Sequence, residues 1–254
     1  MANYSPWPCW GDLIMNYFDL IKEKTFSLAL NAGLLDEMMT IKVRTLGPHE
    51  AIGNPEHDDY PLIKGRERMM EAEFLRSLGQ AYTDMFGSFA GSVREILEME
   101  LTNNYRRAIF VSTINALSKR LGLVDNTVHC KDDKPPLCAR ELVSFVSANY
   151  GNPRIALVGL QPRMLEALSK AFEIRVTDMD ADNIGREKLG TLIYGPEQTA
   201  SNLEWCDVAI ATGTTLTNDS LKEFIQSKPV IFYGVTIAAA SKFLNLNRFC
   251  PYST

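Results

Sequence analysis

The sequence has no apolar run long enough to cross a bilayer, no secretory leader and no long basic segment. Its longest apolar runs, such as residues 155–160, are far shorter than the ~20 residues that a membrane-spanning helix requires. Residues 1–10 contain neither a basic region nor an apolar core, so no secretory signal is expected. Lys and Arg number 26 against 31 Asp and Glu, and the net charge of −5 disfavours nucleic acids and anionic membranes as partners.

Cysteine is also scarce. The five cysteines, an odd number without a dense framework of spacings, predict reduced thiols and a cytoplasmic protein. Hydrolase motifs are missing, since there is no Ser-His-Asp order, no nucleophile elbow and no H-E-x-x-H. The fingerprint G-x-G-x-x-G is absent because positions 159, 161 and 164 are Gly, Gln and Met, so a dinucleotide is not expected as the cofactor.

What the sequence does contain is enough apolar side chains, 46% of its residues, to bury a full core. The first half predicts a small α+β unit in which about three strands form a meander followed by helices. We expect helices at residues 10–31, 92–99 and 103–121, a strand at 38–46, a loop at 47–59 and a hairpin of strands 69–74 and 80–85. Residues 69–74 could instead be helical, because Glu71, Ala72 and Glu73 are poor strand formers.

The second half alternates strands and helices. Strands are expected at residues 154–158, 174–177, 208–211 and 230–233, with helices at 162–171 and 236–244. This alternation predicts βαβ units and an open, parallel, Rossmann-like sheet, so the fold class is α/β. Residues 125–137, rich in Asp, Lys and Pro, are the expected junction between a domain at residues 1–125 and one at 126–254.

The stretch at residues 206–218 is the best candidate for a ligand-binding corner. A short buried strand leads into a loop of small hydroxyl residues around Gly213 and Thr214, and a helix-like pattern follows at residues 219–226. Free backbone N–H groups at a helix start suit an anion or a polar ligand. Helix capping is the alternative, since Ser220 and Glu223 match a capping box and Asn218 is an ordinary N-cap residue.

Other strand ends add polar residues to the same edge, where ligands bind in open parallel sheets. Asp178 and Asp180 follow the second strand, and Gly234 and Thr236 follow the fourth. Asp178 lies 19 residues after Gly159, close to the ~20 that separate the first glycine from the ribose-binding acid in dinucleotide folds. A nucleoside held through its ribose is therefore one hypothesis, and simple capping of the next turn by the two aspartates is the other.

A third group of residues suits a soft metal. His129, Cys130 and Asp132 lie together in the sequence, and Cys250 could join them if the C-terminal segment folds back. The spacing H-C-x7-C, which ends at Cys138, matches no standard zinc site, so a polar linker with cysteines packed as small apolar residues is the alternative. The acidic loop that carries histidines 49 and 57 could bind a cation or be merely solvated.

Seven motifs occur in order between residues 48 and 251 and together resemble one family. They are G-Q-A-Y-T-D-M at 79–85, N-T-V-H-C-K-D-D at 126–133, A-L-V-G-L-Q-P at 156–162, T-D-M-D-A-D-N-I-G at 177–185, W-C-D-V-A-I-A-T-G-T-T-L-T-N at 205–218, P-V-I-F-Y-G-V-T-I-A at 229–238 and R-F-C-P at 248–251. The set resembles a prokaryotic family of uncharacterised proteins named for a role in heavy-metal chelation.

The resemblance implies an enolase N-terminal-like domain joined to a Rossmann-like domain, with a shared site in a cleft between them. It also favours the strand interpretation of residues 69–74. The polar positions that match the family are Thr83, Asp84, His129, Cys130, Lys131, Asp132, Asp178, Asp180, Asn183, Gly213, Asn218, Thr236 and Cys250. One position departs from the family, because Asp219 stands where relatives are expected to have glycine, and its carboxylate would weaken binding of an anion.

Two functions follow as hypotheses. The first is a protein that binds a soft divalent or heavy metal, or a metal chelate, between the two domains. The second is an enzyme with a nucleoside-type cofactor such as S-adenosylmethionine at the carboxyl edge of the parallel sheet. A structural partner of a metal-uptake system, without chemistry of its own, is a third interpretation, and the sequence leaves open whether the chain forms a homo-oligomer.

Overall fold

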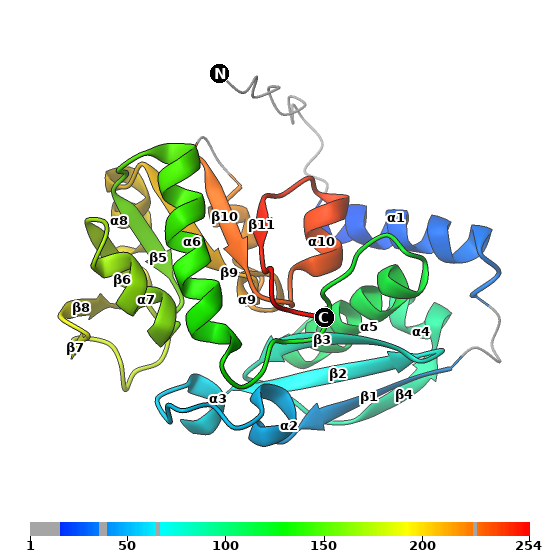
Figure 1. Cartoon of the computed structure of the whole chain (residues 1–254). Coiled ribbons are helices and arrows are strands. Elements are labelled where there is room, and N and C mark those ends of the chain that lie inside the picture. Colours follow the sequence, from blue (N-terminus) through cyan, green and yellow to red (C-terminus); the bar gives the residue numbers. More distant parts are fainter. Residues whose placement is uncertain (1–15, 36–39, 65–66, 226–227) are drawn as a thin grey trace.

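The computed structural model describes residues 16–35, 40–64, 67–225 and 228–254, which form two sheets and the helices that cover them (Figure 1). One sheet has four antiparallel strands and the other has seven mostly parallel strands. The expected α/β fold is therefore confirmed. The division into domains at residues 125 and 126 stays a prediction.

The first sheet has the strand order β3-β2-β1-β4. Its strands are β1 (Thr40–Leu46), β2 (Arg68–Phe74), β3 (Ser77–Thr83) and β4 (Phe89–Ser92). Strands β2 and β3 form a hairpin that turns at Leu75 and Arg76, both with positive φ, as a two-residue turn that matches strand twist requires. This hairpin excludes the helical interpretation of residues 69–74.

Helices of the first half lie on one side of this sheet, as Figure 1 shows. They are α1 (Tyr17–Asn31), α4 (Val93–Glu98) and α5 (Asn104–Arg120), with two short helices, α2 (Pro48–Ile52) and α3 (Pro61–Lys64), at the far end. Ser92 and Glu95 form the capping box that begins α4. The expected helix and strand residues 10–15 and 38–39 lie outside the described residues.

The second sheet has the order β11-β10-β9-β5-β6-β8-β7. Its strands are β5 (Ile155–Val158), β6 (Ile174–Thr177), β7 (Glu187–Lys188), β8 (Thr191–Tyr194), β9 (Val208–Thr212), β10 (Val230–Tyr233) and β11 (Arg248–Phe249). Val208 and Ile210 of the central strand β9 pack in the cluster formed with α6 (Lys134–Tyr150) and α7 (Pro162–Ser169). Ala209 and Ala211 belong to clusters on the other face, so both faces of this strand are buried as its apolar run predicts.

Several expectations about local structure were wrong. The expected loop at 47–59 contains α2, begun by the favourable Pro48. Strands β7 and β11 have two residues each and are too short to show a period in sequence, and β4, β8 and α8 (Thr199–Trp205) were also missed.

The helix expected at residues 219–226 is replaced by two short elements. They are α9 (Thr214–Thr217) and a 3-10 turn, η2 (Leu221–Glu223), and residue 226 lies outside the described residues. The Ser220 side chain does not cap the turn that follows, so the predicted capping box is absent there. The helix α10 (Ala238–Phe243) follows β10 as predicted.

The two halves meet along α5, whose residues from Ala108 to Ser118 are all buried. One apolar cluster joins Phe110 and Ile114 of this helix to Ile237 and Ala239 of the second half. Asn115, near the centre of α5, is fully buried. Both the Nδ2 and the Oδ1 atoms of its side chain form hydrogen bonds to the second half. Its Nδ2 donates to the carbonyls of Gln80, Val235 and Thr236 at 2.9, 3.1 and 3.3 Å, and its Oδ1 accepts from the Ala239 N–H at 2.8 Å.

We expect Asn115→Ala to lower the free energy of unfolding by at least about 2 kcal/mol, because it leaves buried backbone groups without partners. Urea unfolding measured by far-UV circular dichroism checks this. Asn149→Ala is the matched control, since Asn149 lies on the exposed side of α6 and bonds only to the Phe145 carbonyl. The control should change stability by less than about 0.5 kcal/mol. Equal stability of the two variants would contradict the role of Asn115.

Candidate functional site

The carboxyl ends of β9 and β10 lie against the end of β3. The backbone of Tyr82 in β3 is held from both sides, because its N–H donates to Thr236 Oγ1 at 3.0 Å and its carbonyl accepts from Thr217 Oγ1 at 2.8 Å. Gly234 joins the same region, since its carbonyl accepts from Arg248 Nε at 2.9 Å. The strand ends that the sequence predicts as a site therefore face the first sheet.

The Gly213 loop bonds mainly to itself. Thr212 Oγ1 lies 3.0 Å from Thr214 Oγ1 and accepts from the Thr214 N–H at 3.3 Å, and Thr215 donates to the Thr212 carbonyl at 2.9 Å. A Cβ on Gly213 would lie 2.9 Å from the backbone nitrogen of Ile237, so this loop packs directly on the segment before α10. Since α9 has only four residues, its dipole adds little attraction for an anion.

The backbone conformation at position 219 explains why glycine is expected there in relatives and why aspartate is tolerated. Its φ of 60° lies in the left-handed region, which glycine adopts freely and aspartate tolerates better than most residues. Its carboxylate accepts a hydrogen bond from the Tyr17 hydroxyl and lies 3.9 Å from the Arg107 guanidinium. The positive charge of Arg107 offsets the negative charge of Asp219. The position of Asp219 in the structure therefore gives no support to the expectation that it weakens binding of an anion.

Asp178 and Asp180 organise the turn after β6. Asp178 Oδ2 accepts from the Leu160 N–H at 2.6 Å, and its Oδ1 accepts from the Asp180 N–H at 2.7 Å and from Asn183 Nδ2 at 3.3 Å. Asp180 Oδ1 accepts from the Asp182 N–H at 3.0 Å. These bonds agree with the turn-capping alternative. Asn183 is 3% exposed, and its buried Oδ1 has no hydrogen-bond partner in the described parts of the chain.

Asn104 links two other candidate residues at the start of α5. Its Nδ2 donates to Asp84 Oδ1 at 2.7 Å and to Asn218 Oδ1 at 3.4 Å, while its Oδ1 accepts from Arg107. Thr83 is fully buried and donates to the Met85 carbonyl at 3.0 Å. Asp84 and Asn218 therefore lie on either side of one amide, although they come from different halves of the chain.

A group of carboxylates gathers where β2 begins. Burial, together with the charges of Asp178, Asp84 and Asp180, raises the pKa of Glu67 to about 7. Burial also raises the pKa of the hydroxyls of Tyr82 and Tyr233, and Glu67 contributes to both shifts. We call Glu67, Asp84, Asp178 and Asp180 the acidic edge, because they surround the carboxyl edge of the parallel sheet from both halves of the chain.

The His129–Cys130 segment lies beside Tyr82. The rings of Tyr82 and His129 meet edge to face with centroids 5.7 Å apart, and burial lowers the pKa of His129 to about 4, so the imidazole is neutral at pH 7. Its buried Nδ1 has no partner in the part of the chain that the structure describes. Burial raises the pKa of the Cys130 thiol to about 12, and the charge of Cys250 adds to that shift.

The other predicted metal ligands do not complete this set. Asp132 is exposed and accepts from the Asn54 N–H at 2.9 Å, which fixes a loop of the first half, and Lys131 is exposed as well. Across residues 16–35, 40–64, 67–225 and 228–254, no three His, Cys, Asp or Glu side chains gather as ligands for a metal ion. The assignment of His129, Cys130, Asp132 and Cys250 as metal ligands therefore stays a prediction.

Sequence reasoning missed Glu67, Tyr82 and Tyr233. Tyr233 donates to the Gly159 carbonyl at 2.9 Å, and a Cβ on Gly159 would meet that hydroxyl at 3.1 Å, so the turn after β5 is filled by protein. Two of the missed residues do sit inside or next to a matching motif, since Tyr82 lies in G-Q-A-Y-T-D-M and Tyr233 in P-V-I-F-Y-G-V-T-I-A. Glu67 had no such signal.

Two sheets that share one helix, one of them mostly parallel, define an α/β protein. Residues 144–246 match the family model DUF364, described as "Putative heavy-metal chelation", which confirms the resemblance that the motifs predict. The comparison with curated proteins finds no match.

Two solved structures of proteins from the DUF364 family are similar to this chain. A protein of unknown function from the DUF364 family of Pyrococcus horikoshii is 18% identical, with 87% of this chain and 79% of that chain covered and a TM-score of 0.52. A second, from Desulfitobacterium hafniense, is 11% identical over 70% of this chain and 72% of that chain, with a TM-score of 0.48. The first likeness supports the fold. No helix in the described ranges is long and apolar enough to cross a membrane.

The raised pKa of Glu67 predicts a pH-dependent stability. In the unfolded chain Glu67 titrates near 4.5 and in the folded protein near 7, so its contribution to stability is complete below pH 4.5 and is lost as the pH rises through 7. Glu67→Gln, which stays neutral, should therefore raise the melting temperature by a few degrees at pH 8 and leave it unchanged near pH 4.5.

Differential scanning fluorimetry at both pH values measures this. Glu187→Gln, on the exposed edge strand β7, is the matched control and should show no pH-dependent gain. A gain for Glu67→Gln that is the same at both pH values would contradict the titration.

Proposed function

We propose that this protein binds a metal chelate, or another small molecule with positive charge, at the acidic edge between the two halves. The observation that carries the proposal is the convergence of three carboxylates on Glu67, whose pKa its burial and their charges raise to about 7. The negative charges of Asp84 and Asp178 repel an ionised Glu67 carboxylate, which is one reason why the pKa of Glu67 is raised. A cationic ligand would relieve that repulsion and would lower the pKa of Glu67.

A chelate suits the described residues better than a bare ion. A bare soft metal ion held by the protein alone needs three or four ligands, and no such set is gathered in the described ranges. A metal that arrives with its own organic ligands needs only complementary charge and hydrogen bonds, which the acidic edge and the hydroxyl of Tyr82 could supply. The family description of heavy-metal chelation agrees with a metal as cargo.

The nucleoside hypothesis has less support. Both carboxylate oxygens of Asp178 already accept backbone N–H groups, so little capacity is left for a ribose. The glycine turn that would receive the rest of a nucleoside is filled, because Thr212 Cγ2 and the Tyr233 hydroxyl lie within 2.8 and 3.1 Å of where a Cβ on Gly159 would be.

Hexaamminecobalt(III), a cationic complex that keeps its ligands, tests the proposal. Isothermal titration calorimetry should show binding that strengthens as the pH rises from 6 to 8, because Glu67 ionises over that range and adds a negative charge. Glu67→Gln should weaken binding at pH 8 by about tenfold and remove most of its pH dependence. Glu187→Gln should bind like the unaltered protein.

Two further titrations separate the alternatives. Zinc chloride tests a bare ion, and S-adenosylmethionine with adenosine tests the nucleoside hypothesis by thermal shift, since a ligand at 100 times its Kd adds about 2.7 kcal/mol. The proposal fails if hexaamminecobalt(III) does not bind, or if it binds Glu67→Gln as tightly as the unaltered protein. Stabilisation by an adenosine compound alone would favour the enzyme hypothesis instead.

A further inference from the structure

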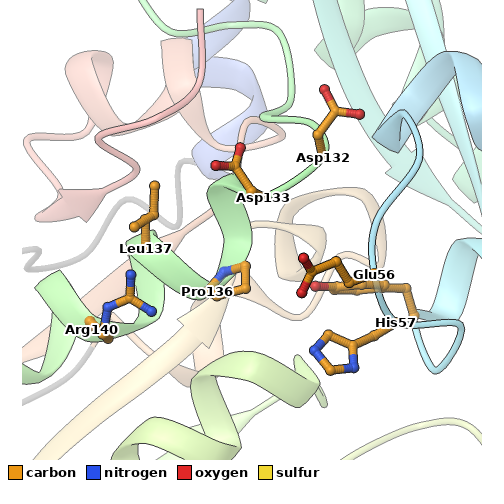
Figure 2. Close-up of a pocket in the computed structure, with 8 residues that line it drawn as sticks. Glu56, His57, Asp132, Asp133, Pro136, Leu137 and Arg140 are labelled. Carbon is orange, nitrogen blue, oxygen red and sulfur yellow. The ribbon is translucent and has the colours of Figure 1, made fainter.

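A second cavity lies apart from the acidic edge, between the loop after α2 and the first two turns of α6 (Figure 2). It has a volume of about 200 Å³, below the roughly 300–1,000 Å³ of sites that hold drug-sized ligands. Its lining residues are Glu56, His57, Tyr60, Asp132, Asp133, Pro136, Leu137 and Arg140. A ligand of few heavy atoms would fit this volume.

The cavity presents charges of opposite sign on opposite walls. Figure 2 shows Glu56 and His57 on the loop wall, and Pro136, Leu137 and Arg140 on the α6 wall. Within the described ranges neither Glu56 nor Arg140 forms an ion pair or a side-chain hydrogen bond. The two charges therefore line one space without neutralising each other.

The carboxylates at the top of the cavity are already used. Asp132 accepts from the Asn54 N–H, and Asp133 lies 3.6 Å from the ammonium of Lys134. Glu56 is thus the carboxylate left for a ligand, and Arg140 offers a planar guanidinium that can bind a carboxylate through two hydrogen bonds.

The hydroxyl of Tyr60 adds a donor to the cavity. Tyr60 lines the cavity and is 7% exposed as a whole, and its hydroxyl has no hydrogen-bond partner among the described residues. The hydroxyl itself is accessible to solvent, so it is free to donate to a carboxylate bound in the cavity. The remainder of the Tyr60 side chain packs with Leu46, Ile52 and Leu62, which fixes the ring.

We propose that this cavity binds a small zwitterion of the α-amino acid class. The ligand carboxylate would bind the Arg140 guanidinium, its ammonium group would bind Glu56, and one carboxylate oxygen would accept from the Tyr60 hydroxyl. A molecule with only one of the two charges would leave the opposite wall unpaired, so both charges are needed for binding.

L-alanine, propionate and ethylamine test this directly, because the last two each lack one charge of the first. Isothermal titration calorimetry, supported by saturation-transfer NMR for weak binding, should show L-alanine or L-glutamine binding at least tenfold tighter than propionate or ethylamine. Arg140→Gln and Glu56→Gln should each weaken the zwitterion by about tenfold to 100-fold, the effect of a lost charge-assisted hydrogen bond. Tyr60→Phe, which keeps the packed ring, should weaken it by about fivefold.

Arg76→Gln is the matched control, since Arg76 is exposed in the β2–β3 turn, and this variant should bind like the unaltered protein. The proposal is overturned if neither amino acid binds, if propionate or ethylamine binds as tightly, or if Arg140→Gln binds unchanged. Hexaamminecobalt(III) should bind Arg140→Gln as tightly as it binds the unaltered protein. The test of amino-acid binding in the cavity is therefore independent of the test of cation binding at the acidic edge.

Discussion

The amide of Asn115 is the interaction on which the arrangement of the two sheets depends. It lies at the centre of a helix without a solvent-facing side and satisfies three carbonyls and one N–H that no regular ladder pairs. Helix α5 can pack this closely on β3 because Gly79 of β3 has no side chain. A Cβ at that position would lie 2.2 Å from the Ala116 nitrogen. Strand, helix and the loop before α10 are thereby held at fixed distances, and the strand ends of the second sheet are placed against Tyr82.

This fixed contact decides which polar residues can serve a ligand. Many of the hydroxyl and carboxyl groups at the sheet edge are used internally, as the bonds of Thr217, Thr236 and Asp178 show. The acidic edge brings together negative charges from residues next to strands of both sheets. These charges, together with burial, raise the pKa of Glu67 to about 7. A separate cavity, lined by Tyr60 and two unpaired charges, lies beside Asp59, which forms an ion pair with Arg163 of the second half at 2.6 Å.

The sequence predicted well those elements that carry a period or a turn signal. The core strands of the second sheet, the β2–β3 hairpin and α5 followed from apolar patterning, whereas β7 and β11, with two residues each, are too short to carry such a pattern. The site was predicted less completely, because its acids come from distant parts of the chain. Asp178 was visible as a strand-end acid, but Glu67 follows no motif and becomes notable only when β2 places it beside Asp84 and Asp178. The short α9 and the internally bonded Gly213 loop likewise depend on tertiary packing against Ile237.

The burial of residues 108–118 of α5 on all sides also bears on how the protein unfolds. Phe110 and Ile114 belong to one apolar cluster with Ile237 and Ala239, so a chain cut after residue 125 would leave one side of this helix in water. Neither sheet has a core that is independent of this helix on the side where they meet. Unfolding should then be cooperative across both sheets, with one transition rather than two, although the two sheets are formed by separate stretches of sequence.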